Sequence, residues 1–153
     1  MDIFTVAQFM RSSSPIIHPD QTFKDAVVVM LEHKTNGLVV VDELKKVVGI
    51  ISSWDLIQYI VPDYLEQDMH LAAFEAGATL EERVHSLANV TIKNVMTKEV
   101  CVIKKEATLM EAAALLSQYR IRQLPVVDDA GILCGYLNRT DIKFAIAKIL
   151  GIL

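Results

Sequence analysis

The sequence indicates an α/β fold built from two pseudo-symmetric β-α-β-β-α repeats, packed as one module with a helical insert between them. The main observation is an internal repetition, because residues 6–59 align without gaps with residues 92–145 at a constant offset of 86. A second observation is that short Val/Leu/Ile runs alternate with segments of helical periodicity in both halves. The identical positions fall at expected helix starts, strand cores and turns: Met10/Met96, Ile17/Ile103, Thr22/Thr108, Ala26/Ala112, Leu38/Leu124, Val40/Val126, Val41/Val127, Asp42/Asp128, Gly49/Gly135 and Asp55/Asp141.

Each repeat opens with a short helical turn and a short strand, followed by a longer helix. We expect the turns at residues 5–8 and 91–94 and the strands at 15–18 and 100–104. The longer helices begin after Thr22 and Thr108, where an acidic residue three positions later completes a capping-box pattern. Their apolar residues recur at helical spacing, which predicts one buried face on each helix: Phe23, Ala26, Val27, Met30 and Leu31 in the first, Leu109, Ala112, Ala113 and Leu116 in the second.

Two strands and a final helix complete each repeat. The dense apolar runs 38–41 and 124–127 stop at an aspartate, and the next strands span 47–51 and 132–137. Near-continuous apolar runs of this kind predict strands that are covered on both faces. The final helices begin near Trp54 and Thr140, and the second continues into an apolar C-terminal stretch.

Residues 62–90 interrupt the symmetry and are rich in acidic side chains. We expect helices over 63–76 and 79–88, with Gly77 between them and Thr79 capping the second. The segment is either a connecting hairpin that covers one side of the core or an acidic surface for a dimer mate or partner. The domain organisation predicted is repeat 1 over 1–61, the insert over 62–90, and repeat 2 with its C-terminal helix over 91–153.

Composition excludes several classes of protein. The formal net charge of −4 argues against a general nucleic-acid surface, whereas the basic residues near the second repeat favour a small anionic ligand. No apolar run approaches the roughly 20 residues that cross a bilayer, and the N-terminus lacks the pattern of a signal peptide. Cys101 and Cys134 are expected to be buried thiols, which favours a cytoplasmic location.

Three segments carry a resemblance to a known family: Leu124-Pro-Val-Val-Asp128, and the paired strand-to-helix segments that run from Gly49 to Asp55 and from Gly135 to Asp141. Together they resemble a tandem pair of cystathionine-β-synthase-type (CBS) domains, a Bateman module, over residues 3–60 and 90–147. The resemblance implies that AMP, ADP, ATP or S-adenosylmethionine binds in clefts between the repeats. It also implies a homodimer of two such pairs.

The family pattern Gly-x-x-Thr/Ser-x-x-Asp has a physical rationale. A carboxylate in the first turn of a helix is favoured by the helix dipole and accepts hydrogen bonds from two ribose hydroxyls, while the helix N-terminus attracts phosphate. The resemblance therefore assigns Asp55 and Asp141 to ribose and Ser52 to phosphate. The second repeat has Asn138 in place of the hydroxyl residue, and Thr140 supplies a hydroxyl one residue before the aspartate.

Basic residues make the two expected sites unequal. The resemblance favours the second repeat, where Arg120 or Arg122 and Arg139 would meet the phosphates, whereas Asn36 and Gly37 occupy the corresponding place in the first. Residues expected near the adenosyl group are Ile16, Cys101, Val102 and Pro125. The alternatives are that Asp55 and Asp141 act only as helix caps and that Arg120 and Arg139 are solvated surface residues.

The sequence does not indicate an enzyme. It contains no glycine-rich phosphate loop, no Cys-x-x-Cys pair and no marked nucleophile, and Glu66, His70 and His85 are better explained as surface charge than as metal ligands. We therefore expect a regulatory module that binds an adenosyl nucleotide and responds by a change in conformation or assembly, without a catalytic cofactor or metal. The alternative is a structural or interaction module whose nucleotide clefts are vestigial.

Overall fold

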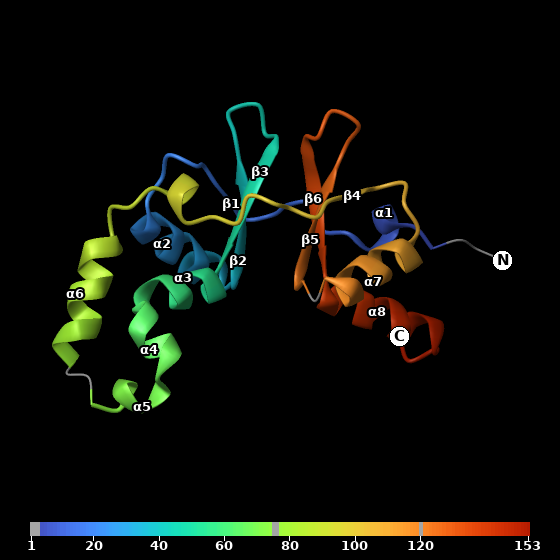
Figure 1. Ribbon diagram of the computed structural model, residues 1–153. Helices are drawn as coiled ribbons and strands as arrows, with labels where there is room; N and C mark the ends of the chain where they lie inside the picture. Colours follow the sequence, from blue (N-terminus) through green and yellow to red (C-terminus); the bar gives the residue numbers. More distant parts are fainter. Residues whose placement is uncertain (1–3, 75–76, 120) are drawn as a thin grey trace. The chain divides into compact units, whose positions relative to one another are not determined.

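The computed structural model describes residues 4–74, 77–119 and 121–153 and confirms the mixed α/β class, with two three-stranded sheets and helices packed on them (Figure 1). Both repeats show the expected β-α-β-β-α order. The elements are α1 (Val6–Phe9), β1 (Ile16–Ile17), α2 (Phe23–His33), β2 (Gly37–Val41), β3 (Val47–Ser52), α3 (Ser53–Ile60), α4 (Asp63–Gln67), α5 (Met69–Ala72), α6 (Gly77–Leu87), the 3-10 turn η1 (Ile92–Asn94), β4 (Ile103–Lys104), α7 (Leu109–Gln118), β5 (Gln123–Val127), β6 (Leu133–Asn138) and α8 (Arg139–Ile149).

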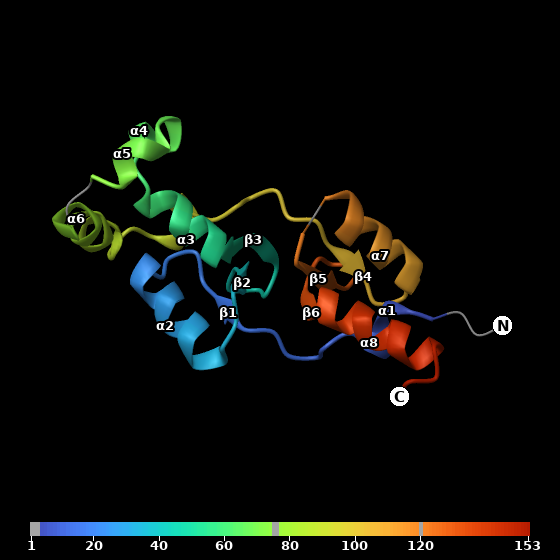
Figure 2. The ribbon, with the colours of Figure 1, turned by 90° about the horizontal axis from the view of Figure 1, so that it is seen from below.

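The two sheets have the same strand order, and their parallel strand pairs have the same register. Their orders are β1-β2-β3 and β4-β5-β6. The parallel pairs Ile17 with Val40 and Ile103 with Val126 differ by the offset of the sequence repeat, so the repetition extends to strand pairing. In Figures 1 and 2, α2 and α3 cover one face of the first sheet, and α7 and α8 cover one face of the second.

The middle strand of each sheet is the buried one. Every residue of β2 is buried, and all but the first residue of β5 are buried, which confirms the prediction for these two strands. The third strands, β3 and β6, instead alternate between buried and half-buried residues. This alternation is typical of a strand with one covered face.

The turns between the last two strands of each repeat explain why both contain an aspartate. Asp42 Oδ1 accepts hydrogen bonds from the backbone N–H groups of Leu44 and Lys46, both at 2.9 Å. Asp128 makes the two equivalent bonds in the second repeat. Each turn needs one left-handed residue, which is Lys45 (φ 61°) in the first and Gly131 (φ 80°) in the second.

Capping boxes begin the four main helices. The N-cap residues are Thr22, Ser52, Thr108 and Asn138, and an acidic side chain three residues later bonds back to the N-cap N–H in each case. Such boxes satisfy two backbone donors that the first helical turn leaves unpaired. The cap positions predicted at Thr22 and Thr108 are confirmed.

The cap of α7 makes stability depend on pH. Hydrogen bonds from Thr108, first from its backbone N–H, hold the pKa of Glu111 below the ordinary value of 4.5. The cap therefore adds stability above the unfolded-state pKa, and this stability is lost as the pH falls through the lower folded-state pKa. As the pH falls from about 5 to about 3, we expect the free energy of unfolding of Glu111→Gln to decrease less than that of the wild type. Urea unfolding measured across that range tests this, and parallel curves for the two proteins would contradict it.

The insert differs from the prediction in two ways. The expected helix over 63–76 is broken at Asp68, which has extended backbone and caps α5 by accepting from the N–H of His70 at 3.0 Å. Asp side chains favour such local bonds over continuing a helix. In addition, Gly77 and Thr79 both belong to α6, so Thr79 does not cap this helix as predicted. Arg83 of α6 donates to the carbonyl oxygens of Tyr59 and Ile60 and thereby ties the insert to the end of α3.

The two repeats exchange their opening segments. Thr5 forms a β-bridge with Thr108, and Thr91 forms the equivalent bridge with Thr22. Val6 donates to the carbonyl of Ala107 at 2.9 Å, and Ile92 donates to that of Gln21 at 2.8 Å. The chain accordingly divides into two compact units: one comprises Met1–Ser14, Val41–Val48 and Glu99–Leu153, and the other comprises Pro15–Val40 and Gly49–Lys98.

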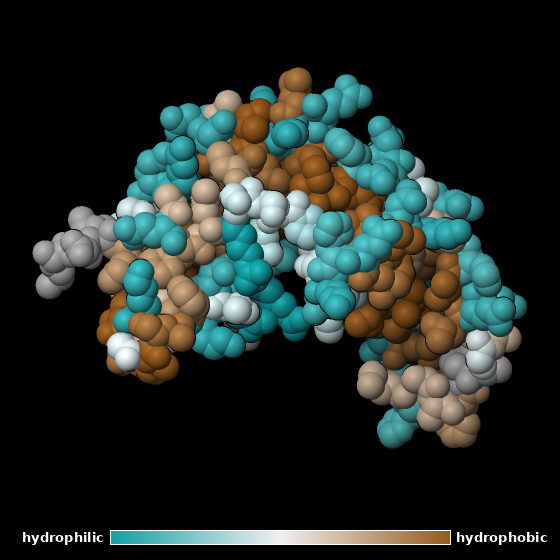
Figure 3. Space-filling view, turned by 180° about the vertical axis from the view of Figure 1, so that it is seen from behind, coloured by the Kyte–Doolittle hydropathy of each residue, from teal (hydrophilic) through white to brown (hydrophobic). Residues whose placement is uncertain are grey.

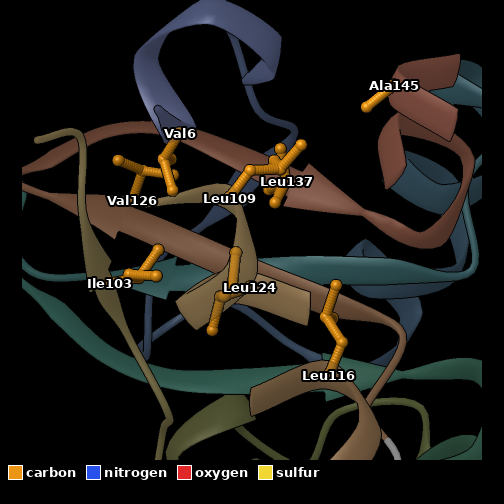
Figure 4. Close-up of a cluster of buried hydrophobic side chains, with 9 residues drawn as sticks. Val6, Ile103, Leu109, Leu116, Leu124, Val126, Leu137 and Ala145 are labelled. Atoms are coloured by element: carbon orange, nitrogen blue, oxygen red, sulfur yellow. The ribbon is translucent and has the colours of Figure 1, made fainter. Parts of the chain in front are cut away.

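Nine buried side chains of the first of these units form a hydrophobic cluster around β5 (Figure 4). Val6 of α1 is completely buried in this cluster although it lies at the start of the sequence. The other labelled members come from the second repeat: Ile103, Leu109, Leu116, Leu124, Val126, Leu137 and Ala145. No helix within the described ranges is both long and apolar enough to cross a membrane.

Candidate functional site

The N-terminus of α8 brings four of the predicted ligand residues together along the chain, from Asn138 to Asp141. Asp141 N–H donates to Asn138 Oδ1 at 3.1 Å, and Asn138 N–H donates to Asp141 Oδ2 at 2.9 Å. The predicted capping role of Asp141 is therefore present. Among the described contacts, the Asn138 side chain uses only its oxygen, so its amide NH₂ remains available to donate to a ligand.

Asp141 is more than a cap, because its carboxylate also forms an ion pair. Only 7% of the residue is exposed, and it is the one buried charged residue in the part of the chain that the structure describes. Arg11 Nε donates to Asp141 Oδ1 at 3.1 Å. A buried carboxylate is costly unless it is paired, and Arg11 supplies both a charge and a hydrogen bond.

Arg11 reaches Asp141 from a segment that β6 holds in place. Its backbone N–H donates to Tyr136 O at 2.9 Å, and Tyr136 N–H donates back to Arg11 O at 3.0 Å. The guanidinium also lies over the Tyr136 ring, 5.8 Å from its centre. The hydrogen bond with Asp141, followed by the attraction of its charge, raises the pKa of Arg11.

Sequence reasoning missed Arg11 as a site residue. It stands between the predicted opening turn and first strand of repeat 1, whereas its partner lies in repeat 2. The available signal was the equivalent position of the second repeat, which is Thr97. The two repeats differ in charge at this position. That signal does not name the partner, which depends on the exchange of the opening segments.

A cavity of about 410 Å³ that is largely open to solvent lies at the start of α8. Leu116 and Ser117 of α7, Ile121 of the following loop and Arg139 of α8 line it. Its lining combines apolar surface with one cation. Such a lining suits a ligand that has both an apolar part and an anionic part.

The other predicted residues of the second repeat lie on several elements. Thr140 is exposed in the first turn of α8, Arg122 is exposed just before β5, and Pro125 is fully buried in β5 opposite Tyr136. Cys101 and Val102 precede β4, and partial burial raises the pKa of the Cys101 thiol. Among the described residues, none of these five side chains hydrogen-bonds to Asp141. Arg120 lies outside the described residues.

The first repeat has the same cap but a different environment. Ser52 N–H donates to Asp55 Oδ2 at 2.7 Å, and the Ser52 hydroxyl donates to the same oxygen at 3.0 Å. Thr97 takes the place of Arg11, bonding through its backbone to Ile50 as Arg11 does to Tyr136. Threonine cannot form an ion pair, so the Asp55 carboxylate lacks the arginine that Asp141 has.

Two further residues distinguish the first repeat from the second. Trp54, which directly precedes Asp55 in the sequence, is 63% exposed, and the second repeat has Thr140 at the equivalent position. Ile16, the candidate in β1, is 37% exposed, so it is accessible from solvent. The two repeats therefore present chemically different helix starts.

The described side chains give no sign of a metal centre, since no three His, Cys, Asp or Glu residues among them are grouped as a metal ion requires. What the arrangement at α8 offers is a set of polar and cationic groups. These are a buried carboxylate that accepts hydrogen bonds, a helix N-terminus with a free side-chain amide, and Arg139 on the wall of the cavity.

Comparison with curated proteins finds relatives of similar sequence. An uncharacterized protein of Methanocaldococcus jannaschii, MJ1426, is 30% identical over 138 residues, which cover 83% of this chain and 82% of the relative. The chloroplastic CBS domain-containing protein CBSX2 of Arabidopsis thaliana is 28% identical over 154 residues. That match covers 95% of this chain, and the chain spans 65% of the length of CBSX2.

Solved structures agree with these relatives. The crystal structure of CBSX2 in complex with AMP superimposes with a TM-score of 0.74 at 28% identity, covering 95% of this chain and 98% of that one. The family model described as the CBS domain matches residues 6–62 and again residues 92–148. These two matches coincide with the internal repetition and with the two β-α-β-β-α units of secondary structure. The chain therefore belongs to the CBS-domain family and carries two copies of the domain in tandem.

Proposed function

We propose that this chain is a regulatory module that binds an adenosyl nucleotide of the AMP, ADP or ATP class at the start of α8 in the second repeat. The observation that carries the proposal is the buried Asp141 carboxylate, which is held at a helix N-terminus by Asn138 and Arg11. A buried charge is rarely retained for stability alone, since a well-packed apolar residue is often as favourable. Ligand recognition gives that carboxylate a role.

Each part of a nucleotide has a matching group near this helix start. The ribose hydroxyls would donate to Asp141, which accepts through both oxygens. The phosphates would meet the helix N-terminus, the Asn138 amide, the Thr140 hydroxyl, and the cations Arg139 and Arg122. The adenine would lie against apolar surface, for which Cys101, Val102 and Pro125 are our candidates.

The comparison with CBSX2 supports the class of ligand. That protein has been crystallised with AMP, and it matches nearly the whole of this chain in sequence and fold. Binding of AMP, ADP or ATP by this chain would make it a sensor of cellular energy state. S-adenosylmethionine lies outside this class, but it shares the adenosine that Asp141 would recognise and is therefore included in the test.

We propose the second repeat as the main site. Arg139 lines a cavity there, and Arg122 precedes β5, whereas Asn36 and Gly37 occupy the place of Arg122 in the first repeat. The first repeat keeps Ser52 and Asp55, so a weaker second site for the same ligand is part of the proposal.

The response to the ligand would be a change in conformation or in association with a second copy. The helix that begins at the proposed site ends in exposed apolar residues, among them Ile149 and Leu150. Figure 3 shows hydrophobic surface at this C-terminal end and separately along α2, where Leu31 is 73% exposed. Exposed apolar patches on a protein of this size mark contact surfaces, and a homodimer would cover them.

Isothermal titration with AMP, ADP, ATP and S-adenosylmethionine tests the proposal. We expect the wild type to bind at least one of them with a micromolar Kd, which corresponds to about −8 kcal/mol. Asp141→Asn keeps the shape of the side chain but removes its charge. Since hydrogen bonds to a charged group contribute about 1.5–3 kcal/mol each, its Kd should rise at least ~100-fold. Sedimentation with and without ligand reports the change in assembly.

Glu111→Gln is the matched control for this experiment. Glu111 holds the same position in the capping box of α7, and its hydrogen bonds are with Thr108 and not with a proposed ligand group, so its loss should leave the Kd unchanged. Folded protein without carried-over ligand that binds none of the four compounds would contradict the proposal. That result would favour the interaction module, for which the exposed Met69 and Phe74 of the insert are the first contact candidates.

A further inference from the structure

Arg11 has a second consequence for the site, which rests on the proposed function. The two oxygens of Asp141 are already engaged: Oδ2 accepts from Asn138 N–H at 2.9 Å, and Oδ1 accepts from Arg11 Nε at 3.1 Å. The bond to Asn138 belongs to the helix cap and remains as long as α8 is formed. The bond to Arg11 is made by a side chain that is 48% exposed, whereas the Asp141 side chain is only 10% exposed.

A ribose hydroxyl that approaches Asp141 therefore competes with Arg11. The Asp141 side chain is nine-tenths covered and its Oδ1 already accepts from Arg11, so a ribose hydroxyl that takes the place of Nε at this oxygen displaces the guanidinium. The movement does not require the backbone of Arg11, which two hydrogen bonds to Tyr136 hold in place, to shift. Rotation of the long side chain is sufficient, and it gives up the contact with the Tyr136 ring as well as the bond to Asp141.

The displacement has a different cost for different ligands. Hydroxyl groups are neutral donors, so their hydrogen bonds to the carboxylate lack the attraction between opposite charges that the bond from Arg11 has. Arg11 also loses its anionic partner. A ligand with a phosphate group supplies a new anion to which a guanidinium binds in a two-pronged geometry, whereas an adenosyl compound without phosphate supplies none.

We propose that Arg11 selects phosphorylated adenosyl ligands, by exchanging the Asp141 carboxylate for the ligand phosphate when the nucleotide binds. The site then holds its cation paired in both states. Nucleosides and thioethers of adenosine have to break the same ion pair without replacing it, and they bind less well for that reason.

The first repeat provides an internal reference for this selection. Thr97 stands where Arg11 stands, with the same backbone bridge to the neighbouring strand. Arg11→Thr therefore introduces a residue that the fold already accepts at the equivalent position, and it removes the guanidinium together with most of the aliphatic side chain. Circular dichroism and the urea midpoint of the variant establish that it is folded before binding is measured.

The test compares AMP with 5′-methylthioadenosine, which has the same adenosine but no phosphate, for wild type and Arg11→Thr. We expect the wild type to bind AMP at least tenfold more tightly than 5′-methylthioadenosine. In Arg11→Thr that preference should fall at least tenfold, because AMP binds more weakly while 5′-methylthioadenosine binds as well as before or better. Lys93→Gln removes one positive charge from an exposed ion pair with Asp20 and should leave both constants unchanged.

The outcomes separate the possible roles of Arg11. An equal weakening of both ligands would overturn the proposal and make Arg11 a residue that only positions Asp141. An unchanged preference would overturn it as well. If the folded wild type binds neither compound, the proposed function itself fails, which differs from binding that lacks the selection.

Discussion

Replacing Gly135 with alanine is expected to lower the free energy of unfolding by about 2–3 kcal/mol, which is the upper part of the range for overpacking by added methyl groups. A Cβ atom at this position would overlap with the carbonyl oxygen of Arg11. That oxygen cannot move aside, because it accepts the hydrogen bond from Tyr136 N–H at 3.0 Å. The variant therefore separates the Arg11 segment from β6. Urea unfolding followed by circular dichroism measures the loss.

The equivalent glycine of the first repeat makes a graded comparison. A Cβ on Gly49 would overlap with Met96 Sδ, which is part of a flexible side chain, so Gly49→Ala should cost less than half as much. At Gly77, the first residue of α6, no atom of the described residues lies within 4 Å of an added Cβ, and alanine is the better helix former, so Gly77→Ala should leave stability unchanged or raise it by up to about 1 kcal/mol. A wild-type urea midpoint for Gly135→Ala would contradict the close contact between the Arg11 segment and β6.

Truncating either of two equivalent leucines should have the next largest effect. Leu38 of β2 and Leu124 of β5 are both completely buried. Leucine-to-alanine changes in packed cores cost about 3 kcal/mol, from lost burial and from the cavity that remains. We expect losses of that size for Leu38→Ala and for Leu124→Ala, measured by urea unfolding.

Leu44 is the control for these two variants. It lies in the turn before β3 and is 69% exposed, so Leu44→Ala should change stability by no more than about 0.5 kcal/mol. The single tryptophan, Trp54, belongs to the same compact unit as Leu38, and its fluorescence reports on that unit directly. A loss below about 1 kcal/mol for either buried leucine would contradict the close packing of its strand.

Much of the fold was predictable because the signals are local and occur twice. The capping pairs at Thr22 and Thr108 fixed the starts of two helices, and the runs ending at Asp42 and Asp128 fixed two strands and their turns. Repetition strengthened each signal, since a pattern found at the same offset in both halves is unlikely to arise by chance. The family followed from the same segments.

What escaped prediction depends on distance along the chain. The break at Asp68 came from one side chain that satisfied a local N–H instead of continuing the helix. Arg11 and Asp141 are separated by 130 positions in the sequence. Periodicity predicts which residues share a face of one helix or strand, and it does not predict an ion pair between residues so far apart. The helix-cap residues of the candidate site were predictable, but their ionic environment required the tertiary structure.

The exchange of opening segments also bears on how such a chain can arise. The opening turn of each repeat packs on the other repeat, at the start of α2 or of α7. A single repeat alone would lack that turn. A polypeptide of half the length could make the same contacts as a symmetric dimer, in which the opening turn of each copy packs on the other copy. Joining two such copies end to end keeps these contacts and makes the association permanent. It then lets one copy acquire an arginine where the other keeps a threonine, which a symmetric pair of identical chains cannot do.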